Sequence, residues 1–346
     1  MIRIRHLVAV LVCSQVALFA AAVQAAPGDK VGGLAISGEE LSKRLARYAP
    51  ASLSPDLTRL HESDRAMLGK LIEAAHEIDH VYWEQVSPQG YETWQRLQAM
   101  GNEHADRLAR FMALNYGPWD RFHDDEPFYG QALKPPGANF YPPDLSALAF
   151  ERQLSASAQL RHEGAATTLV DELKSPYSLV RREGDRLKAE PYSRVFYEPL
   201  LKAANLLKEA AALSRCRPMA KFLQLRAVDL LTNKYYQSEI QWMNTGECPI
   251  EIVIGPYETY EDHLMGQKTA FEAIIAIKDA VATQAVATWT PLVQDLAATL
   301  PLKREIRDNL RPSAATGITV ADVAYTAGDA RARFQVQAYR LPNDER

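Results

Sequence analysis

Several motifs that would assign a function directly are missing from this chain. Its 346 residues contain no Gly-x-Ser-x-Gly elbow, phosphate-binding loop or dinucleotide fingerprint. The sequence therefore carries no signature of an α/β-hydrolase, a P-loop nucleotidase or a Rossmann oxidoreductase. The Gly255-Pro256 pair does not substitute for a phosphate loop, because proline lacks the N–H that an anion-binding nest requires.

Excess positive charge and cysteine are also lacking. The chain has 39 Lys and Arg against 43 Asp and Glu, a net charge of −4, so composition does not suggest nucleic acid or an anionic membrane as a partner. Of the three cysteines, only Cys216 and Cys248 lie outside the first 25 residues. Two cysteines do not form a zinc framework by themselves. They either pair in an oxidising compartment or remain buried thiols.

Long apolar runs are restricted to the N-terminus. Leu7 to Phe19 is apolar apart from a short polar interruption, follows Arg3 and Arg5, and precedes small residues that end at Ala25. This order predicts a signal peptide over residues 1–25. An uncleaved anchor is the alternative, although the run is short for a span of about 20 residues. We expect an exported protein, periplasmic or secreted, without a membrane anchor after cleavage.

Helical periodicity is the most abundant pattern in the rest of the chain. Apolar residues recur at three and four between Ser37 and about Leu114. Further helices are expected at 197–214, 217–243 and 264–297, the last with Phe271, Ile274, Ile275 and Val281 on one face. Strands are expected as a hairpin over 177–190 and at 251–254, 318–320 and 332–338. The predicted fold class is α+β and predominantly helical.

Two segments are rich in residues that build binding sites. Residues 116–145 combine prolines with aromatics, which predicts an ordered, aromatic-packed loop. The strand at 251–254 is expected to end at a Gly-Pro corner, followed by Glu258, Tyr260, Glu261 and Asp262. Polar side chains at the rim of a rigid strand are typical of clefts. The alternative is a packed polar corner.

One motif suggests a metal. The segment from His76 to His80 reads His-Glu-Ile-Asp-His, and two histidines at i and i+4 of a helix can bind zinc while Glu77 acts as general base. Asp79 places a charge where such a helix is usually buried, and no third ligand stands out. The same residues also fit a packing helix whose histidines lie on its wetter side.

Six short segments in a fixed order resemble a known family. They are Gly117-Pro-Trp-Asp-Arg121, Lys134-Pro-Pro-Gly-Ala-Asn-Phe-Tyr-Pro142, Leu225-Arg-Ala227, Gly255-Pro-Tyr-Glu-Thr-Tyr-Glu-Asp262, Phe271-Glu-Ala273 and Leu341-Pro-Asn-Asp344. This pattern is similar to the bacterial branch of the dipeptidyl peptidase III family of zinc metallopeptidases. The similarity covers roughly residues 40 to 346.

The resemblance implies two lobes around a wide cleft and the removal of dipeptides from the N-termini of short peptides. Residues 26–262 would form a mixed lower lobe with a small β-barrel or sheet, 263–304 a helical segment of an incomplete upper lobe, and 305–346 a return to the lower lobe. The family's zinc helix lies beyond the position that matches Asn343. We therefore expect zinc as the cofactor of the complete family protein, and no catalysis from this chain alone.

The resemblance also implies two substrate-binding residues. Glu251 matches a glutamate that receives the peptide's free ammonium group, and Asn343 matches an asparagine that binds the peptide backbone. Val253 and Arg340 depart from the family, which has tyrosine and asparagine there. Short peptides are the expected partners, and the apolar face of the 264–297 helix predicts self-association. The alternatives are a non-catalytic peptide-binding or structural protein and an independent zincin that uses His76, Glu77 and His80.

Overall fold

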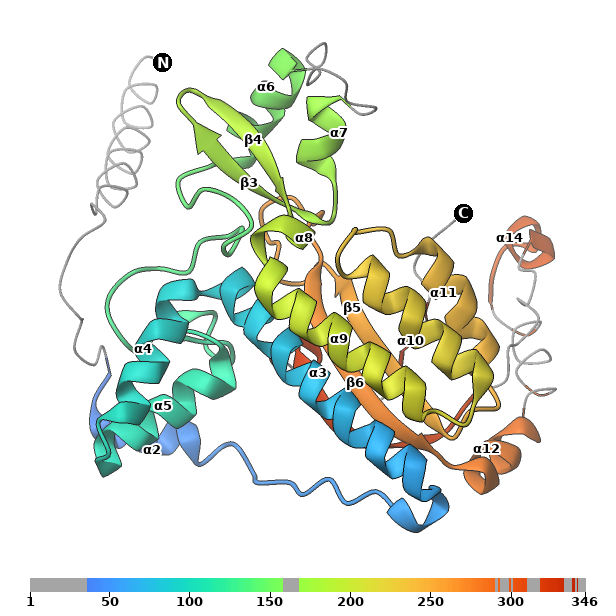
Figure 1. Cartoon of the computed structure of the whole chain (residues 1–346). Helices are drawn as coiled ribbons and strands as arrows, with labels where there is room; N and C mark the ends of the chain where they lie inside the picture. Colours follow the sequence, from blue (N-terminus) through green and yellow to red (C-terminus); the bar gives the residue numbers. More distant parts are fainter. Residues whose placement is uncertain are drawn as a thin grey trace, which may run out of the picture.

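The computed structural model describes residues 36–157, 168–289, 301–309 and 318–332, with Leu292, Thr299, Ala338, Tyr339 and Leu341 in addition. Within these residues the protein is mostly helical and contains three small antiparallel sheets (Figure 1). The predicted α+β class is confirmed. The predicted signal peptide and the two residues Arg340 and Asn343 lie outside the described residues. None of the described helices has the length and apolarity that a membrane span requires.

Helices fill the N-terminal third, as predicted, and side-chain caps divide them. The helices are α2 (Gly38–Leu45), α3 (Glu62–Val86), α4 (Pro88–Ala99) and α5 (Glu103–Asn115), with a 3₁₀ turn, η1 (Leu57–Arg59), before α3. His61, Ser87 and Asn102 each accept a hydrogen bond from a first-turn N–H of α3, α4 and α5. Capping of these otherwise unpaired donors explains where each helix begins.

A three-stranded sheet forms the centre of the molecule. It consists of β5 (Ile250–Glu258), β6 (Ala270–Lys278) and β7 (Ala321–Gly328), antiparallel in the order β5-β6-β7. Helices α3 and α9 (Tyr197–Leu213) lie across one face of this sheet (Figure 1). Side chains such as Ile78, Ile252 and Ile275 are buried between these layers.

The helix predicted over 264–297 is wrong. Residues Ala270–Lys278 form strand β6, and helix α12 covers only Ala280–Ala287. Every β6 residue from Ala270 to Ile277 is buried. A strand that is buried on both faces reads as a continuous apolar run, which periodicity does not distinguish from a buried helix.

This correction removes the basis for the predicted self-association. Phe271, Ile274 and Ile275 are at most 4% exposed, whereas Val281 is 83% exposed. The expected apolar face therefore does not exist on a helix here. Within segment 263–304 the described helix is α12, and α14 (Arg304–Asn309) begins at the last residue of this segment. The lobe boundaries remain a prediction.

The hairpin predicted over 177–190 is confirmed. It consists of β3 (Ser178–Glu183) and β4 (Arg186–Pro191), and Gly184 supplies the left-handed turn residue at φ 61°. Two helices precede it, α6 (Ala147–Ser157) and α7 (Leu169–Lys174), and α8 (Tyr192–Val195) leads from it into α9.

The expected helix over 217–243 is divided. Its parts are α10 (Arg217–Asp229), α11 (Tyr236–Trp242) and the 3₁₀ turn η2 (Met243–Thr245). The break contains Asn233 in the left-handed region at φ 57°, a conformation that ends a helix. Cys216 before α10 and Cys248 before β5 form a disulfide with a Cα–Cα distance of 5.7 Å, one of the two states that the sequence left open.

The C-terminal tail differs from the prediction, and the proline-rich loop agrees with it. The strand expected at 318–320 begins at Ala321 instead, and the described start of the 332–338 strand, Ala332, ends helix α15 (Asp329–Ala332). The loop over 116–145 is ordered and packed, as predicted. It contains the short strands β1 (Trp119–Asp120) and β2 (Glu126–Pro127), and it buries Phe128 and Phe140.

Candidate functional site

The face of the central sheet away from α3 and α9 carries the predicted ammonium-binding residue. Glu251 pairs with Ala276 in the β5–β6 register, and Gly255 pairs with Glu272. Because directly paired residues point to the same face and alternate residues share it, Glu251 and Glu272 lie on one face. Val253 and Ile274 lie between them and form a small apolar cluster with Ala330.

Glu251 is held by two donors. It is 8% exposed; its Oε1 accepts a hydrogen bond from Trp242 Nε1 at 2.9 Å, and its Oε2 lies 2.9 Å from Lys278 Nζ. Lys278 also donates to the carbonyl oxygens of Thr245 and Gly246 at 2.8 and 3.0 Å. A carboxylate offers about four acceptor positions, so the two donors named leave capacity for a further N–H.

Tyr339 lies within electrostatic reach of both carboxylates. Burial raises the pKa of the Tyr339 phenol above its usual value, and the charges of Glu251 and Glu272 raise this pKa further. Both glutamates are less than a tenth exposed, and charges interact more strongly where water is excluded. The acceptor positions left on Glu251 suit a further N–H donor on this sheet face. Val253 is buried and supplies no hydrogen-bond donor to it.

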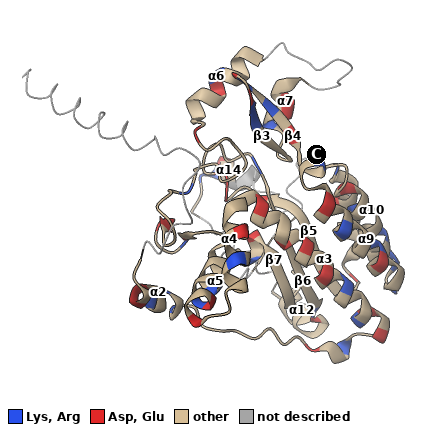
Figure 2. Cartoon of the chain, turned by 60° about the vertical axis from the view of Figure 1, so that its left-hand side comes forward, with Lys and Arg blue, Asp and Glu red and all other residues tan. Residues whose placement is uncertain are grey.

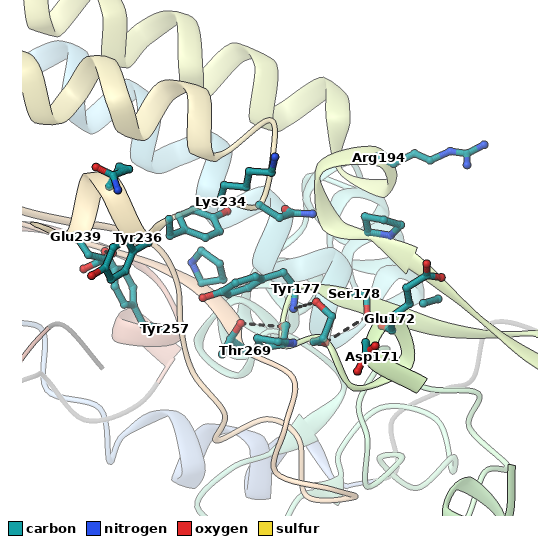
Figure 3. Close-up of a pocket in the computed structure, with 18 of the residues that line it drawn as sticks. Asp171, Glu172, Tyr177, Ser178, Arg194, Lys234, Tyr236, Glu239, Tyr257 and Thr269 are labelled. Carbon is teal, nitrogen blue, oxygen red and sulfur yellow. Dashed lines mark hydrogen bonds between the residues drawn. The ribbon is translucent and has the colours of Figure 1, made fainter. Parts of the chain in front are cut away.

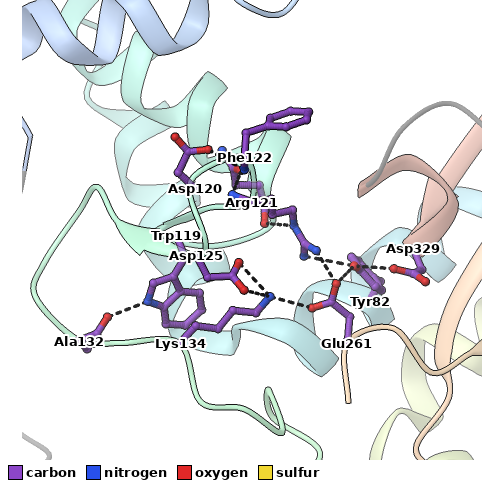
Figure 4. A network of polar contacts seen from close by, with 11 residues as sticks. Tyr82, Trp119, Asp120, Arg121, Phe122, Asp125, Ala132, Lys134, Glu261 and Asp329 are labelled. Atoms are coloured by element: carbon purple, nitrogen blue, oxygen red, sulfur yellow. Dashed lines mark hydrogen bonds and ion pairs between the residues drawn. The ribbon is translucent and has the colours of Figure 1, made fainter. Parts of the chain in front are cut away.

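The cluster after β5 is a packed corner and not a cleft rim. Strand β5 continues through Gly255-Pro256 to Glu258, so the predicted strand end at the Gly-Pro corner is wrong. Glu261 is 1% exposed; it forms ion pairs with Arg121 and, at 3.1 Å, with Lys134, and it accepts a hydrogen bond from the Tyr82 hydroxyl at 2.9 Å (Figure 4). Although burial opposes the charge of Arg121, Glu261 raises the pKa of this guanidinium.

Asp262 shapes the β5–β6 connection from the same corner. Its carboxylate accepts four backbone N–H bonds, from Leu264, Met265, Gln267 and Lys268, and one from the Tyr141 hydroxyl at 2.9 Å. Such a saturated carboxylate fixes a loop. Tyr260 is 53% exposed. The buried contacts of Glu261 and Asp262 agree with the packed-corner interpretation.

The residues of the His-Glu-x-x-His motif are engaged elsewhere. On α3, the His76 ring packs edge-on against Tyr325 at 5.1 Å and the His80 ring stacks on Tyr91 at 4.8 Å. Glu77 lies 3.9 Å from Lys202. Across the part of the chain that the structure describes, no three His, Cys, Asp or Glu side chains group as zinc ligands would. The residues present do not fit a zinc site, and we derive no hydrolytic step from them.

A large cavity that sequence reasoning missed lies at the free edge of β5 (Figure 3). It measures about 1300 Å³ and lies between the α7–β3–β4 region and the α10–α11 turn. Trp242 Nε1 and Arg226 Nη1 donate to the carbonyl oxygens of Ile252 and Ile254 at 3.0 and 2.7 Å, which satisfies the exposed edge of the strand.

Arg226 forms the back of this cavity. Its side chain is fully buried, pairs with Glu239 and donates to the Tyr257 hydroxyl at 2.6 Å. The only signal in the sequence was Leu225-Arg-Ala227, one of the six segments of the resemblance. A single arginine in a helix does not reveal that it is buried.

Comparison with known proteins agrees with this fold. No family model matches the chain. The structure is similar to dipeptidyl peptidase III from Caldithrix abyssi, with 34% identity and a TM-score of 0.80 over 88% of this chain and 56% of that protein. Dipeptidyl peptidase III from Corallococcus sp. strain EGB gives 32% identity and a TM-score of 0.77 over 88% and 55%.

A curated plant protein is also similar. Nudix hydrolase 3 of Arabidopsis thaliana is 31% identical over 349 residues, which cover 88% of this chain and 45% of that protein. Its name describes a different activity, and the alignment covers less than half of it, so that activity is not assigned to this chain.

Both solved structures share fold and sequence with most of this chain. They support a dipeptidyl peptidase III-like family, and the resemblance predicted from the six segments is confirmed. The chain spans about half the length of the relatives that it matches.

Proposed function

We propose that this chain is the peptide-holding part of an exported, dipeptidyl peptidase III-like metallopeptidase, and that Glu251 receives the free N-terminus of short peptides. The observation that carries the proposal is the buried Glu251 carboxylate, with Glu272 on the same sheet face of a dipeptidyl peptidase III-like fold. Hydrogen bonds between an ammonium and a carboxylate are among the strong ones in proteins.

The acceptor capacity of Glu251 supports an ammonium ligand. Lys278 pairs with Glu251, and its bonds to Thr245 and Gly246 hold it in place. Trp242 and Lys278 use two of the about four acceptor positions of the Glu251 carboxylate, so a further N–H donor could bind without displacing either of them. A peptide ammonium would add to the Lys278–Glu251 pair and would not replace it.

We infer binding for this chain and assign no bond-breaking step to its described residues. Asn343, the second predicted contact, lies outside the described residues and remains part of the proposal through the resemblance. A non-catalytic peptide-binding protein would show the same affinity. Measuring dipeptide release alongside binding separates the two, because the non-catalytic protein would bind without turnover.

Export is a further part of this proposal. The N-terminal sequence over residues 1–25 has the order of a signal peptide, and the Cys216–Cys248 disulfide suits an oxidising compartment. Mass spectrometry of the mature protein would test it: a first residue just after Ala25 supports export, and an intact Met1 contradicts it.

The binding proposal is tested by calorimetry with tetra-alanine and the Glu251→Gln variant. Loss of a charge-assisted contact of about 1.5–3 kcal/mol should weaken binding roughly 10- to 100-fold. Glu258→Gln is the matched control, because it makes the same change at the other end of β5 and should leave the affinity within about 2-fold. Equal affinities of wild type and Glu251→Gln would refute the proposal.

A further inference from the structure

Both donors that hold Glu251 depend on one short segment, residues 242–248, which leads from the end of α11 to β5 and contains the turn η2. We refer to it as the η2 segment. Its first residue, Trp242, donates through Nε1 to Glu251 Oε1 at 2.9 Å. Lys278 belongs to β6, but its ammonium donates to two carbonyl oxygens of the η2 segment at 2.8 and 3.0 Å while it pairs with Glu251. The position of the segment therefore sets the position of both donors.

Hydrogen bonds within the η2 segment connect these donors to the disulfide. Thr245 Oγ1 donates to the carbonyl oxygen of Trp242 at 2.7 Å, and the backbone N–H of Cys248 donates to the carbonyl oxygen of Thr245 at 2.9 Å. That same Thr245 oxygen accepts from Lys278. Cys248 ends the segment, and its disulfide to Cys216 ties this end to the start of α10. One carbonyl oxygen thus links the disulfide to the lysine beside Glu251.

The disulfide can be attacked from one side. Cys248 is 1% exposed, whereas Cys216 is only partly buried. A thiolate that attacks the Cys216 sulfur releases Cys248 as a thiol. With a dithiol as reductant, its second thiol then displaces Cys216, so both cysteines become thiols and the dithiol becomes a disulfide. In the reverse direction, two electrons and two protons pass from the cysteine thiols to a disulfide oxidant, which becomes a dithiol.

We propose that the Cys216–Cys248 disulfide controls peptide binding at Glu251: the closed bond fixes the η2 segment, and the segment holds Trp242 and Lys278 in place. This inference rests on the proposed function of Glu251. A carboxylate whose donors are fixed in advance binds more tightly, because less order has to be created on binding. After reduction the end of the segment at Cys248 is no longer tied to α10, and the carbonyl oxygens that hold Lys278 gain freedom.

Reduction loosens the η2 segment without detaching the helices on either side. Gln241 Nε2 donates to the carbonyl oxygen of Pro218 at 3.1 Å, and this bond holds α11 on α10 in both redox states. The expected effect is therefore a change in affinity and not the loss of the fold.

Control of this kind suits an exported protein. Disulfides form in the periplasm and outside the cell, whereas thiols stay reduced in the cytoplasm. Because residues 1–25 predict export, the bond would close only after the chain has left the cytoplasm. The site would bind cytoplasmic peptides weakly and reach full affinity in the compartment of the mature protein.

The first test needs no peptide and uses the indole N–H signals of the full chain in NMR. Reduction with dithiothreitol should shift the Trp242 signal upfield, because its N–H spends less time bonded to Glu251. Trp119 is the internal control: its Nε1 donates to the carbonyl oxygen of Ala132 at 2.7 Å in the proline-rich loop, and its signal should not move. An unchanged Trp242 signal, or movement of both signals, would overturn the inference.

The second test measures the affinity for tetra-alanine by calorimetry. Reduction should weaken binding by wild type about 3- to 10-fold, and Cys216→Ala/Cys248→Ala should bind as reduced wild type does, with or without reductant. In Glu251→Gln, whose binding is already weak, reductant should have no further effect, because the carboxylate on which the disulfide acts is absent. An equal effect of reductant on wild type and Glu251→Gln would contradict the inference.

The same measurements separate this inference from the proposed function. If Glu251→Gln weakens binding but reductant leaves wild type unchanged, the redox control is refuted and the ammonium site stands. If wild type and Glu251→Gln bind equally, the ammonium site is refuted, and redox control of peptide binding at Glu251 is refuted with it.

Thr245→Ala tests the link while the disulfide stays closed. This variant removes the hydroxyl bond to the Trp242 carbonyl oxygen and should weaken tetra-alanine binding about 3-fold. Thr245→Ser keeps the hydroxyl and should bind as wild type does. Gly184→Ala is the control for destabilisation alone, since Gly184 lies in the distant β3–β4 turn, and it should keep the wild-type affinity. Wild-type affinity of Thr245→Ala, or equal weakening by Gly184→Ala, would count against the inference.

Discussion

At the scale of single residues, buried charges join parts of the chain that are far apart in sequence. Glu261 connects the 116–145 loop to α3 through Arg121, Lys134 and Tyr82 (Figure 4). Lys268, fully buried, donates to the carbonyl oxygens of Leu173 and Ser175 at 2.6 and 2.7 Å. The sequence indicated a polar cluster near these positions, but it did not reveal which charges would be paired, because their partners lie more than 90 residues away.

Replacing Glu261 should be strongly destabilising. Glu261→Gln leaves Arg121 in a buried position without its carboxylate, which should lower the free energy of unfolding by about 3–5 kcal/mol. Urea denaturation measures the change. Glu126→Gln is the control, because the Glu126 side chain is 53% exposed and its partner Arg44 keeps its ion pairs with Glu40 and Asp120. The loss should therefore be at most about 1 kcal/mol. Similar losses in both variants would contradict the packed-corner interpretation.

Lys268 should make the stability depend on pH. Burial lowers the pKa of its ammonium to about 7, while Asp262 opposes this shift. Between about pH 7 and 10 the unfolded chain then binds more protons at this lysine than the folded chain, so the contribution of Lys268 to stability rises with pH. The difference in unfolding free energy between wild type and Lys268→Met should rise over this range, and a constant difference would show that Lys268 stays charged when folded.

At the scale of elements, the sequence predicted helices and hairpins better than buried strands. Apolar periodicity predicted the helical region that contains α3, and the pattern over 177–190 predicted the β3–β4 hairpin. Strand β6 differs from the predicted helix because Phe271 to Ile277 is apolar except for Glu272 and pairs on both sides, with β5 and β7. The paired residues of β6 and β7 are up to 56 positions apart, as in Glu272 with Gly328, and a local pattern does not contain such pairing.

The disulfide should stabilise the fold by closing the segment between α10 and β5. For the sequence separation of 32 residues, the chain-entropy estimate is about 3–4 kcal/mol. Denaturation with and without reductant should show a loss of this size in wild type and none in the Cys216→Ala/Cys248→Ala double variant. An equal effect of reductant on both proteins would mean that the disulfide does not act in this way.

Two glycines with the same backbone conformation should differ in their tolerance of alanine. Gly184 and Gly328 have φ of 61° and 62°, but a Cβ at Gly184 meets nothing within 4 Å, whereas at Gly328 it would lie 2.2 Å from the carbonyl oxygen of Phe271. Gly184→Ala should cost about 1–2 kcal/mol for the left-handed conformation. Gly328→Ala should cost at least about 2 kcal/mol more, because β6 and β7 must separate. Thermal melts compare the two, and equal losses would contradict the close strand approach.

At the scale of the whole molecule, the chain has a dipeptidyl peptidase III-like fold, and we propose that one face of its central sheet binds peptides. Side chains of both charge signs occur on α9 and α10 (Figure 2), while the buried residues Glu251 and Glu272 lie on the central sheet. The resemblance of six segments pointed to Glu251, but strand register was needed to find Glu272 and Lys278 beside it. The edge cavity was not predictable, because its wall combines residues from 171 to 269.

We propose that the protein recognises the charged N-terminus of a peptide. Its most direct test compares the affinities of wild-type protein for tetra-alanine and for acetyl-tetra-alanine, which differ in the terminal ammonium. If Glu251 binds the ammonium group, the acetylated peptide should bind at least about 10-fold more weakly. Equal affinity for the two peptides would show that Glu251 does not bind the ammonium group.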